Sequence, residues 1–333
     1  MGSYIEGWWD CEDLEELFAR LCHLDPPFWE RLRSYIHNMT NRQLPSLSGY
    51  VAKFHYDLGN DFFESFLDKD MQYTCLYWRE PGTGRPAKDL EVDFEEAAFF
   101  KLELIAKKLK LKPGMKVLEL GSGWGALAKH LTENYGVEMV CYCNSEQMVL
   151  HTREVTKGLP VEVHLADYRE ATGLYDRVVS IGMFEHVGFK NYKTFFEVAD
   201  RCLKDDGLLL LHSMALHDSL HGFPKYLSWE RYLDTYYFPG YWMPTDTDFV
   251  VASKGIFILE DLHNFGADYR PTLLGWWENF QKNWHKVQDK YDSKLYRVYK
   301  VFFLMCVGSF RARSLLQGVY SKAGVPGGYE AVR

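Results

Sequence analysis

Short apolar runs alternate with helix-like stretches through the middle of the chain. A periodicity of three to four residues predicts a helix over about 94–109, which ends at the breaker Lys112-Pro113-Gly114. Strands and helices then alternate, an order typical of a parallel sheet covered by helices on both faces. In such a sheet the ligand lies at the carboxyl ends of the strands. The expected strands are 116–120, 138–143, 161–165, 177–181 and 208–211, and the expected helices between the first three are 126–135 and about 145–157.

The two flanks of this α/β core have a different pattern. Residues 1–45 read as amphipathic helix, because Leu14, Leu17, Phe18 and Leu21 recur at the spacing of one helical face. After residue 215 the pattern loosens into aromatic-rich helical segments, with one further strand candidate at 256–260. Helical additions are therefore expected both before and after the sheet.

Polar or ionisable residues follow each of the five expected strands. A single such group is more often a helix cap or a satisfied buried group, but five in succession are hard to explain as core or surface. At this edge of the sheet, ribose hydroxyls and an adenine amino group would find polar partners. The pattern predicts a nucleoside cofactor site beside a catalytic site. In strand order the residues are Glu119, then Asn144, Ser145 and Gln147, then Asp167 and Tyr168, then Glu185 and His186, then His212 and Ser213.

The turn after the first strand is rich in glycine. Residues 117–125 read VLELGSGWG, so Gly121, Gly123 and Gly125 follow a buried strand and lead into a helix. Such a turn lets a cofactor press against bare backbone, although alone it is equally often a plain tight turn. It lacks the third glycine of a dinucleotide fingerprint, which disfavours a pyrophosphate cofactor. S-adenosylmethionine fits better, with its amino-acid end at this turn.

Composition narrows the possible partners. The formal charge of −8 leaves no global basic field for nucleic acid, so we expect no nucleic-acid partner. Local basic runs at 107–112 and 311–313 are compatible with anionic lipid, but such runs are usually solvated faces. The 10 Trp, 22 Tyr and 22 Phe suggest an aromatic-walled cavity or, equally, an aromatic-heavy core.

The cysteines and the hydropathy pattern bear on the cellular compartment. The seven cysteines are scattered without zinc-finger spacing, so we expect no metal site and a reducing cytosol. No apolar stretch reaches transmembrane length, and residues 1–30 lack a signal-peptide pattern. The expected location is cytoplasmic, with any membrane association peripheral.

Several long motifs together resemble one family. The chain is similar to the cyclopropane-fatty-acyl-phospholipid synthases, which are methyltransferases related to the mycolic acid cyclopropane synthases. The similarity runs from Tyr4 to Arg333, and a joint chance match to so many motifs is not credible. The motifs are 6–11 (EGWWDC), 55–61 (HYDLGND), 71–78 (MQYTCLYW), 182–188 (GMFEHVG) and 263–269 (HNFGADY).

This resemblance implies roles for individual residues. Tyr73 and Thr74 would contact the methionine part of S-adenosylmethionine, and Gly121 and Gly123 would form the cofactor turn. Gln147 would lie at the ribose and Asp167 near the adenine. A second set, with the backbone of Met214, would hold a bicarbonate ion. That set is Cys75, Glu185, His212 and Tyr269.

The resemblance also implies a reaction. The family adds a methylene group from S-adenosylmethionine to the cis double bond of an unsaturated acyl chain. Methyl transfer to an alkene leaves a carbocation, and the ring closes when a base removes a proton from the new methyl group. A bound bicarbonate can take that proton in a dry pocket, whereas a protein carboxylate beside a cation could be alkylated. The implied partners are unsaturated phospholipid acyl chains at a membrane surface and a second copy of the chain in a homodimer.

The domain boundaries and departures from the family follow from the same comparison. Residues 1–50 form a helical segment that is shorter than the family's by roughly fifty residues. Residues 51–333 form the S-adenosylmethionine-dependent methyltransferase domain, with acyl-binding helical insertions at about 216–250 and 267–305. Ser122 stands where Cys is common in the family.

Two alternatives to cyclopropanation stay open. The turn at 143–147 is one residue shorter than the usual bacterial form and is similar to that of N-methyltransferase relatives. A C- or N-methyltransferase acting on another lipid or small molecule is therefore one alternative. A non-catalytic lipid-binding module is another, although Glu185, His212 and Tyr269 argue against it.

Overall fold

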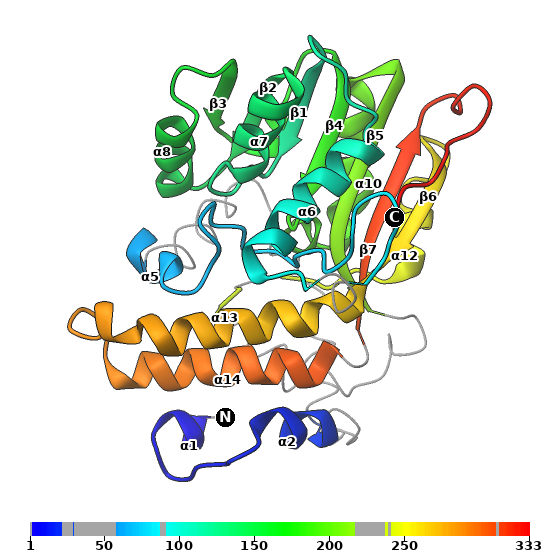
Figure 1. Ribbon diagram of the computed structural model, residues 1–333. Helices are drawn as coiled ribbons and strands as arrows, with labels where there is room; N and C mark the ends of the chain where they lie inside the picture. The colour runs from blue at the N-terminus through cyan, green and yellow to red at the C-terminus, as the bar shows by residue number, and fades with distance from the viewer. Residues whose placement is uncertain are drawn as a thin grey trace.

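The computed structural model describes residues 2–21, 29, 58–86, 91–216, 237–238, 241–310 and 313–333. Its centre is a seven-stranded sheet in the order β3-β2-β1-β4-β5-β7-β6 (Figure 1). The predicted α/β fold with a Rossmann-like sheet is confirmed, with the first three strands at the predicted bounds. The strands are β1 (Lys116–Leu120), β2 (Glu138–Cys143), β3 (Val161–Leu165), β4 (Tyr175–Ile181), β5 (Leu203–Leu216), β6 (Ile258–Asn264) and β7 (Arg313–Ser321).

The sheet is mixed, which corrects the expectation of a purely parallel sheet. Strands β3, β2, β1, β4 and β5 run parallel, but β7 lies antiparallel between β5 and β6. The sequence pattern missed β7 because Gln317 and Gly318 interrupt its apolar run, and both faces of this strand are buried. Strand β5 extends to Leu216, five residues beyond its predicted end, because its outer half pairs with β7.

Helices cover both faces of the sheet. On one face α6 (Phe94–Lys108), α7 (Ala126–Tyr135) and α8 (Glu146–Val155) pack on side chains such as Val117, Val179 and Leu210. On the other face α9 (Phe184–Val187), α10 (Tyr192–Cys202) and α12 (Asp246–Val251) pack on the alternate positions, including Leu118 and Leu209. Because successive residues of a strand point to opposite faces, the continuous apolar runs of β1 and β5 supply both layers.

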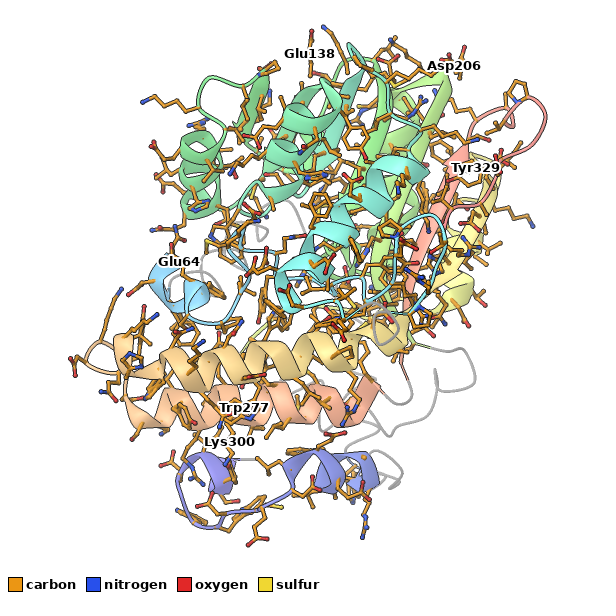
Figure 2. The ribbon with its side chains drawn as sticks, in the orientation of Figure 1. Glu64, Glu138, Asp206, Trp277, Lys300 and Tyr329 are labelled. Atoms are coloured by element: carbon orange, nitrogen blue, oxygen red, sulfur yellow. The ribbon has the colours of Figure 1, made fainter. Side chains whose placement is uncertain are left out.

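Two long antiparallel helices lie across the carboxyl ends of the parallel strands (Figure 1). Helices α13 (Tyr269–Asn283) and α14 (Ser293–Ser309) fall in the region where we expected an acyl-binding insertion. Trp277 of α13, labelled in Figure 2, contacts the ring of Tyr296 of α14 at a centroid distance of 5.8 Å. The first expected insertion, 216–250, lies mostly outside the described residues, so both insertions stay predictions.

The N-terminal helices pack on α14. Leu14 and Phe18 of the amphipathic α2 (Leu14–Leu21) are buried against it, as their spacing predicts. Helix α1 (Gly2–Ile5) is also in contact with α14, and the Arg297 guanidinium lies over the Tyr4 ring at 4.1 Å. Most of 22–57, including part of motif 55–61, lies outside the described residues. The remaining short helices are α5 (Asn60–Glu64), η2 (Tyr168–Glu170), η3 (Phe189–Asn191), η6 (Gly266–Asp268) and η7 (Trp284–Lys286).

Candidate active site

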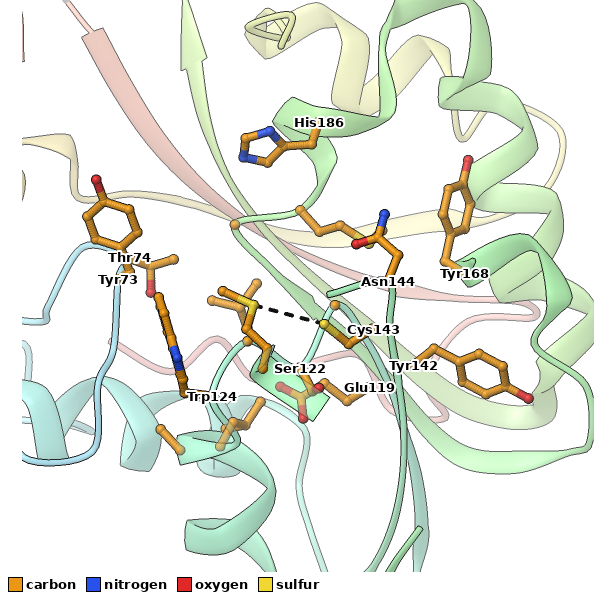
Figure 3. A pocket seen from close by; sticks show the side chains of 18 of the residues that line it. Tyr73, Thr74, Glu119, Ser122, Trp124, Tyr142, Cys143, Asn144, Tyr168 and His186 are labelled. Carbon is orange, nitrogen blue, oxygen red and sulfur yellow. Dashed lines mark hydrogen bonds between the residues drawn. The ribbon is translucent and has the colours of Figure 1, made fainter. Parts of the chain in front are cut away.

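A pocket opens at the carboxyl ends of β1 to β4, where the sequence predicts the cofactor (Figure 3). Tyr73, Thr74 and Trp124 lie on one side of it, and Asn144 and Tyr168 lie on the opposite side. The two sides differ in chemistry, because the first lies at the glycine turn and the second follows β2 and β3. An elongated ligand with two unlike ends fits this arrangement.

The glycine turn brings bare backbone to the pocket. Gly121 has φ +88°, a conformation that disfavours any residue with a Cβ. A Cβ placed there would lie 2.9 Å from the Met183 Cβ, so the approach of the turn to the end of β4 also requires glycine. The turn ends at Gly125, directly before the first residue of α7, and therefore presents a helix start toward the pocket.

Most of the predicted cofactor residues line this one pocket. They are Tyr73, Thr74, Glu119, Gly121, Gly123, Asn144, Asp167 and Tyr168. Ser145 and Gln147 do not line it. The Ser145 hydroxyl instead caps α8 by accepting from the Met148 backbone N–H, and the Gln147 side chain is exposed on the first turn of that helix. The structure therefore does not bring these two into the pocket.

The charged groups of the pocket have partners within the protein. Asp167 accepts hydrogen bonds from the backbone N–H of Arg169 and from its guanidinium at 2.7 Å and 3.0 Å. Glu119 accepts from the Cys141 thiol at 3.5 Å, and its burial raises its pKa to about 8. A buried lysine, Lys101, donates to the Thr74 hydroxyl at 2.7 Å.

Sequence reasoning missed several residues that line the pocket, among them Lys101, Trp124 and Tyr142. One signal was available for the lysine. Lys101 falls on the buried stripe of α6 between Ala98 and Leu102, where a solvated lysine is out of place. The aromatic residues carry no comparable signal, because an aromatic side chain at such a position is usually core.

The four residues predicted to hold an anion lie beside the pocket in a buried polar cluster. We use this name for Cys75, Glu185, His212 and Tyr269, which are all buried and do not line the pocket. They come from four segments: the loop after α5, helix α9, the interior of β5 and the first residue of α13. His212 thus lies within a strand rather than at its end, which corrects the predicted bound of β5.

Hydrogen bonds hold the members of this cluster close together. Glu185 Oε1 accepts from the backbone N–H of Met214 at 2.7 Å, two residues beyond His212 on β5. The His212 carbonyl accepts from the N–H of Gly182 at 2.9 Å, at the end of β4. The Tyr269 hydroxyl makes a hydrogen bond with the Cys75 backbone and lies within electrostatic range of Glu185. Cys75, Glu185 and Tyr269 are therefore neighbours, and His212 is joined to them through the backbone of β5.

Burial favours the uncharged form of every member of the cluster. Glu185 is 2% exposed, and desolvation raises its pKa to about 7 against the opposing N–H of Met214. Desolvation lowers the pKa of His212 well below its usual value, with the nearby lysines Lys101 and Lys108 acting in the same direction. Burial also raises the pKa of Cys75 and of Tyr269 well above their ordinary values.

Two polar atoms of the cluster have no hydrogen-bond partner among the described residues: Glu185 Oε2 and His212 Nε2. The other imidazole nitrogen, Nδ1, lies 3.0 Å from the Gln317 amide nitrogen. An amide nitrogen only donates, so Nδ1 accepts and Nε2 carries the proton. Buried polar atoms without a partner are rare and point to a missing ligand or water.

His186 lies in the pocket, whereas its neighbour Glu185 belongs to the buried polar cluster. It directly follows Glu185, but its ring lines the pocket and lies 5.5 Å from the ring of Phe238. Desolvation lowers the pKa of His186 to about 4, so the ring is neutral near pH 7.

Within the described ranges no group of three or more His, Cys, Asp or Glu side chains is arranged to hold a metal ion. None of the helices described has both the length and the apolar character needed to cross a membrane.

The fold and the pocket define an S-adenosylmethionine-dependent methyltransferase. Solved structures agree: the cyclopropane synthase MmaA2 from Mycobacterium tuberculosis is 29% identical, with a TM-score of 0.76 over 82% of this chain and 98% of that chain. The mycolic acid cyclopropane synthase CmaA1, complexed with S-adenosylhomocysteine and CTAB, is 30% identical, with a TM-score of 0.75 over the same shares. Coclaurine N-methyltransferase, at 19% identity and a TM-score of 0.77, shares the fold.

The particular family follows from the sequence comparisons. The family model described as mycolic acid cyclopropane synthetase matches residues 48–317. The cyclopropane-fatty-acyl-phospholipid synthase of Escherichia coli K12 is 38% identical over 339 residues, which cover 99% of this chain and 84% of that protein. The chain belongs to the mycolic acid cyclopropane synthetase family. The expected family and enzyme class are confirmed.

Proposed function

We propose that the protein converts the cis double bond of an unsaturated phospholipid acyl chain into a cyclopropane ring. The name of the Escherichia coli relative supports the phospholipid substrate, and the family supports the ring-forming chemistry. When bound, S-adenosylmethionine supplies the transferred methyl carbon, and bicarbonate is the base for one of its protons. A peripheral encounter with the membrane surface as a homodimer is part of the same proposal.

The pocket would orient the cofactor by its two unlike sides. The glycine turn and Thr74 suit the amino-acid end, because backbone N–H groups and a hydroxyl can donate to a carboxylate. Asn144 and Asp167 suit the ribose and the adenine, and Tyr168 offers a ring face for stacking.

The buried polar cluster fits a small oxyanion. When Glu185 is protonated, its carboxyl, the His212 Nε2–H and the Tyr269 phenol are three uncharged donors, and the first two offer polar atoms without a partner among the described residues. Neutral donors bind an anion in a low-dielectric site without placing a like charge beside it. Cys75, Glu185, His212 and Tyr269 are therefore the residues that would hold bicarbonate.

A single observation carries this proposal: Glu185 Oε2 and His212 Nε2 are buried and have no hydrogen-bond partner among the described residues, and burial favours the neutral form of both groups. Transfer of a methyl group to nitrogen or oxygen requires no separate anion of this kind.

The test is to incubate the protein with S-adenosylmethionine and a monounsaturated phospholipid and to analyse the acyl chains by mass and by double-bond content. The expected product gains one CH2 and loses the double bond. A product that gains CH2 and keeps an alkene would show C-methylation instead. Cofactor binding without turnover of any olefin would contradict the proposed reaction and favour a lipid-binding role.

A further inference from the structure

Lys101 is a buried lysine that the proposed reaction does not use. It projects from the middle of α6 and is 2% exposed, among the apolar side chains of the stripe that faces the sheet. Burial of an ammonium is costly, so its retention here asks for a partner. Desolvation lowers the pKa of Lys101 to about 8, against the opposing effect of the nearby carboxyl groups of Asp68 and Glu119.

Its partner is the hydroxyl of Thr74, at 2.7 Å. Both residues line the cofactor pocket. An ammonium group has donors only, so the Thr74 oxygen accepts and its hydrogen remains available for a second partner. The side-chain methyl of Thr74 is fixed on its other side, because it lies against Gly182, where a Cβ would come within 2.5 Å of Thr74 Cγ2. The orientation of the hydroxyl is therefore set by two contacts.

Glu119 is a second ionisable group near Lys101. Glu119 lines the same pocket, lies within electrostatic range of Lys101 and also has a pKa moved toward neutrality by burial. An amino-acid tail carries one carboxylate and one ammonium. The Lys101–Thr74 pair suits the carboxylate, and the Glu119 carboxyl suits the ammonium.

We propose that Lys101 is a positioning residue for the cofactor, which holds the Thr74 hydroxyl as a donor to the carboxylate of the amino-acid tail. This inference rests on the proposed function for the identity of the cofactor. On this proposal α6 contributes to cofactor binding together with the glycine turn.

A second buried lysine on the same helix provides the matched control. Lys108 lies two helical turns after Lys101 and is also fully buried, but its ammonium lies 3.1 Å from His263 Nδ1 and 3.7 Å from Asp261 Oδ2, and it does not line the pocket. Replacement of either lysine by methionine removes a desolvated charge and keeps most of the volume. A general effect of the loss of a buried lysine would appear in both variants.

The experiment compares two ligands by titration calorimetry: S-adenosylhomocysteine and 5′-methylthioadenosine, which lacks the amino-acid tail. Lys101→Met is expected to weaken S-adenosylhomocysteine at least about 10-fold, the effect of one lost charge-assisted hydrogen bond, and to change 5′-methylthioadenosine less than about 2-fold. Lys108→Met is expected to change neither. An equal loss for both ligands, or unchanged S-adenosylhomocysteine affinity, would overturn the proposal.

A second pair of variants keeps the test decisive if Lys101→Met fails to fold. Thr74→Val removes the hydroxyl and keeps the shape, and it should reproduce the selective loss, whereas Thr74→Ser keeps the hydroxyl and should retain most of the affinity. Equal behaviour of these two variants would contradict the proposal. If the variants lose affinity for S-adenosylhomocysteine but not for 5′-methylthioadenosine, and the wild-type protein forms no ring, the proposed function would be contradicted. The role of Lys101 in cofactor binding would still stand.

Discussion

The cofactor pocket and the buried polar cluster adjoin each other but differ in how their ionisable groups are stabilised. In the pocket, charged groups already pair within the protein, as Asp167 does with Arg169 and Lys101 with Thr74. In the cluster, burial favours the neutral form of each group, and Glu185 Oε2 and His212 Nε2 lack partners among the described residues. The charged groups of the pocket are thus paired before a ligand arrives, although the Ser122 and Tyr168 hydroxyls there also lack a partner among the described residues. In the cluster it is the ionisable groups themselves that have such atoms.

This difference implies that binding and ring closure can be separated by mutation. Changes in the pocket should act first on the affinity for S-adenosylhomocysteine. Changes in the cluster should act on the rate of ring formation and leave that affinity as it is.

Glu185→Ala should show the largest effect. It removes the carboxyl that would donate to the anion, and the loss of a group that serves proton transfer costs about 100-fold or more in rate. Ring formation from a monounsaturated phospholipid should fall by that factor, with S-adenosylhomocysteine affinity within about 2-fold of wild type. A variant that keeps its rate would remove Glu185 from the site.

Gly121→Ala should act on the cofactor pocket. The added Cβ would clash with Met183 at 2.9 Å, and φ +88° is strained for alanine, so S-adenosylhomocysteine affinity should fall about 10-fold. The control is Gly158→Ala, where φ is +85° but nothing lies within 4 Å of the added Cβ. If calorimetry gave the same loss for both variants, backbone strain and not the pocket would be the cause.

Gln317→Leu should have a moderate effect. It removes the donor to His212 Nδ1 and with it the constraint that keeps the proton on Nε2. The loss of one buried hydrogen bond corresponds to about a 5-fold fall in the rate of ring formation, again without loss of cofactor affinity. A change confined to cofactor affinity would place Gln317 with the pocket instead.

The pH dependence of bicarbonate activation should be the smallest effect. Below about pH 7 the Glu185 carboxyl is protonated and donates, whereas above it the carboxylate repels the anion. Expressed per bicarbonate ion, the concentration for half-maximal activation should therefore rise as pH increases through about 7. Glu185→Gln does not ionise and should show a flat profile, so a wild-type profile that is equally flat would count against this protonation state.

The sequence predicts the strands well where their neighbours are local. Strands β1 to β3 have the predicted bounds because each is a short apolar run closed by a turn or a helix cap. Strand β7 could not be found this way, since its burial depends on β5 and β6, which precede it by about a hundred and by about fifty residues.

The residues of the candidate site differ in the same way in how far the sequence alone predicts them. Glu119, Asn144 and Asp167 were visible as strand ends, because parallel pairing brings consecutive ends together. Glu185 and His212 of the cluster were visible in the same way, but Cys75 and Tyr269 were found only through the family resemblance, since they reach the cluster from outside the parallel strands. Lys101 was missed, although a lysine on the apolar stripe of α6 is a readable signal.

The most direct test of the cluster's role follows the hydrogens of the transferred methyl group. S-adenosylmethionine with a trideuterated methyl group and a monounsaturated phospholipid would be incubated with the protein, and the acyl product would be analysed by mass spectrometry. If the cluster serves removal of a proton from the new methyl group, the ring carbon keeps two of its three deuterium atoms, and product formation falls when bicarbonate is depleted. Retention of all three deuterium atoms, or a rate independent of bicarbonate, would contradict the account.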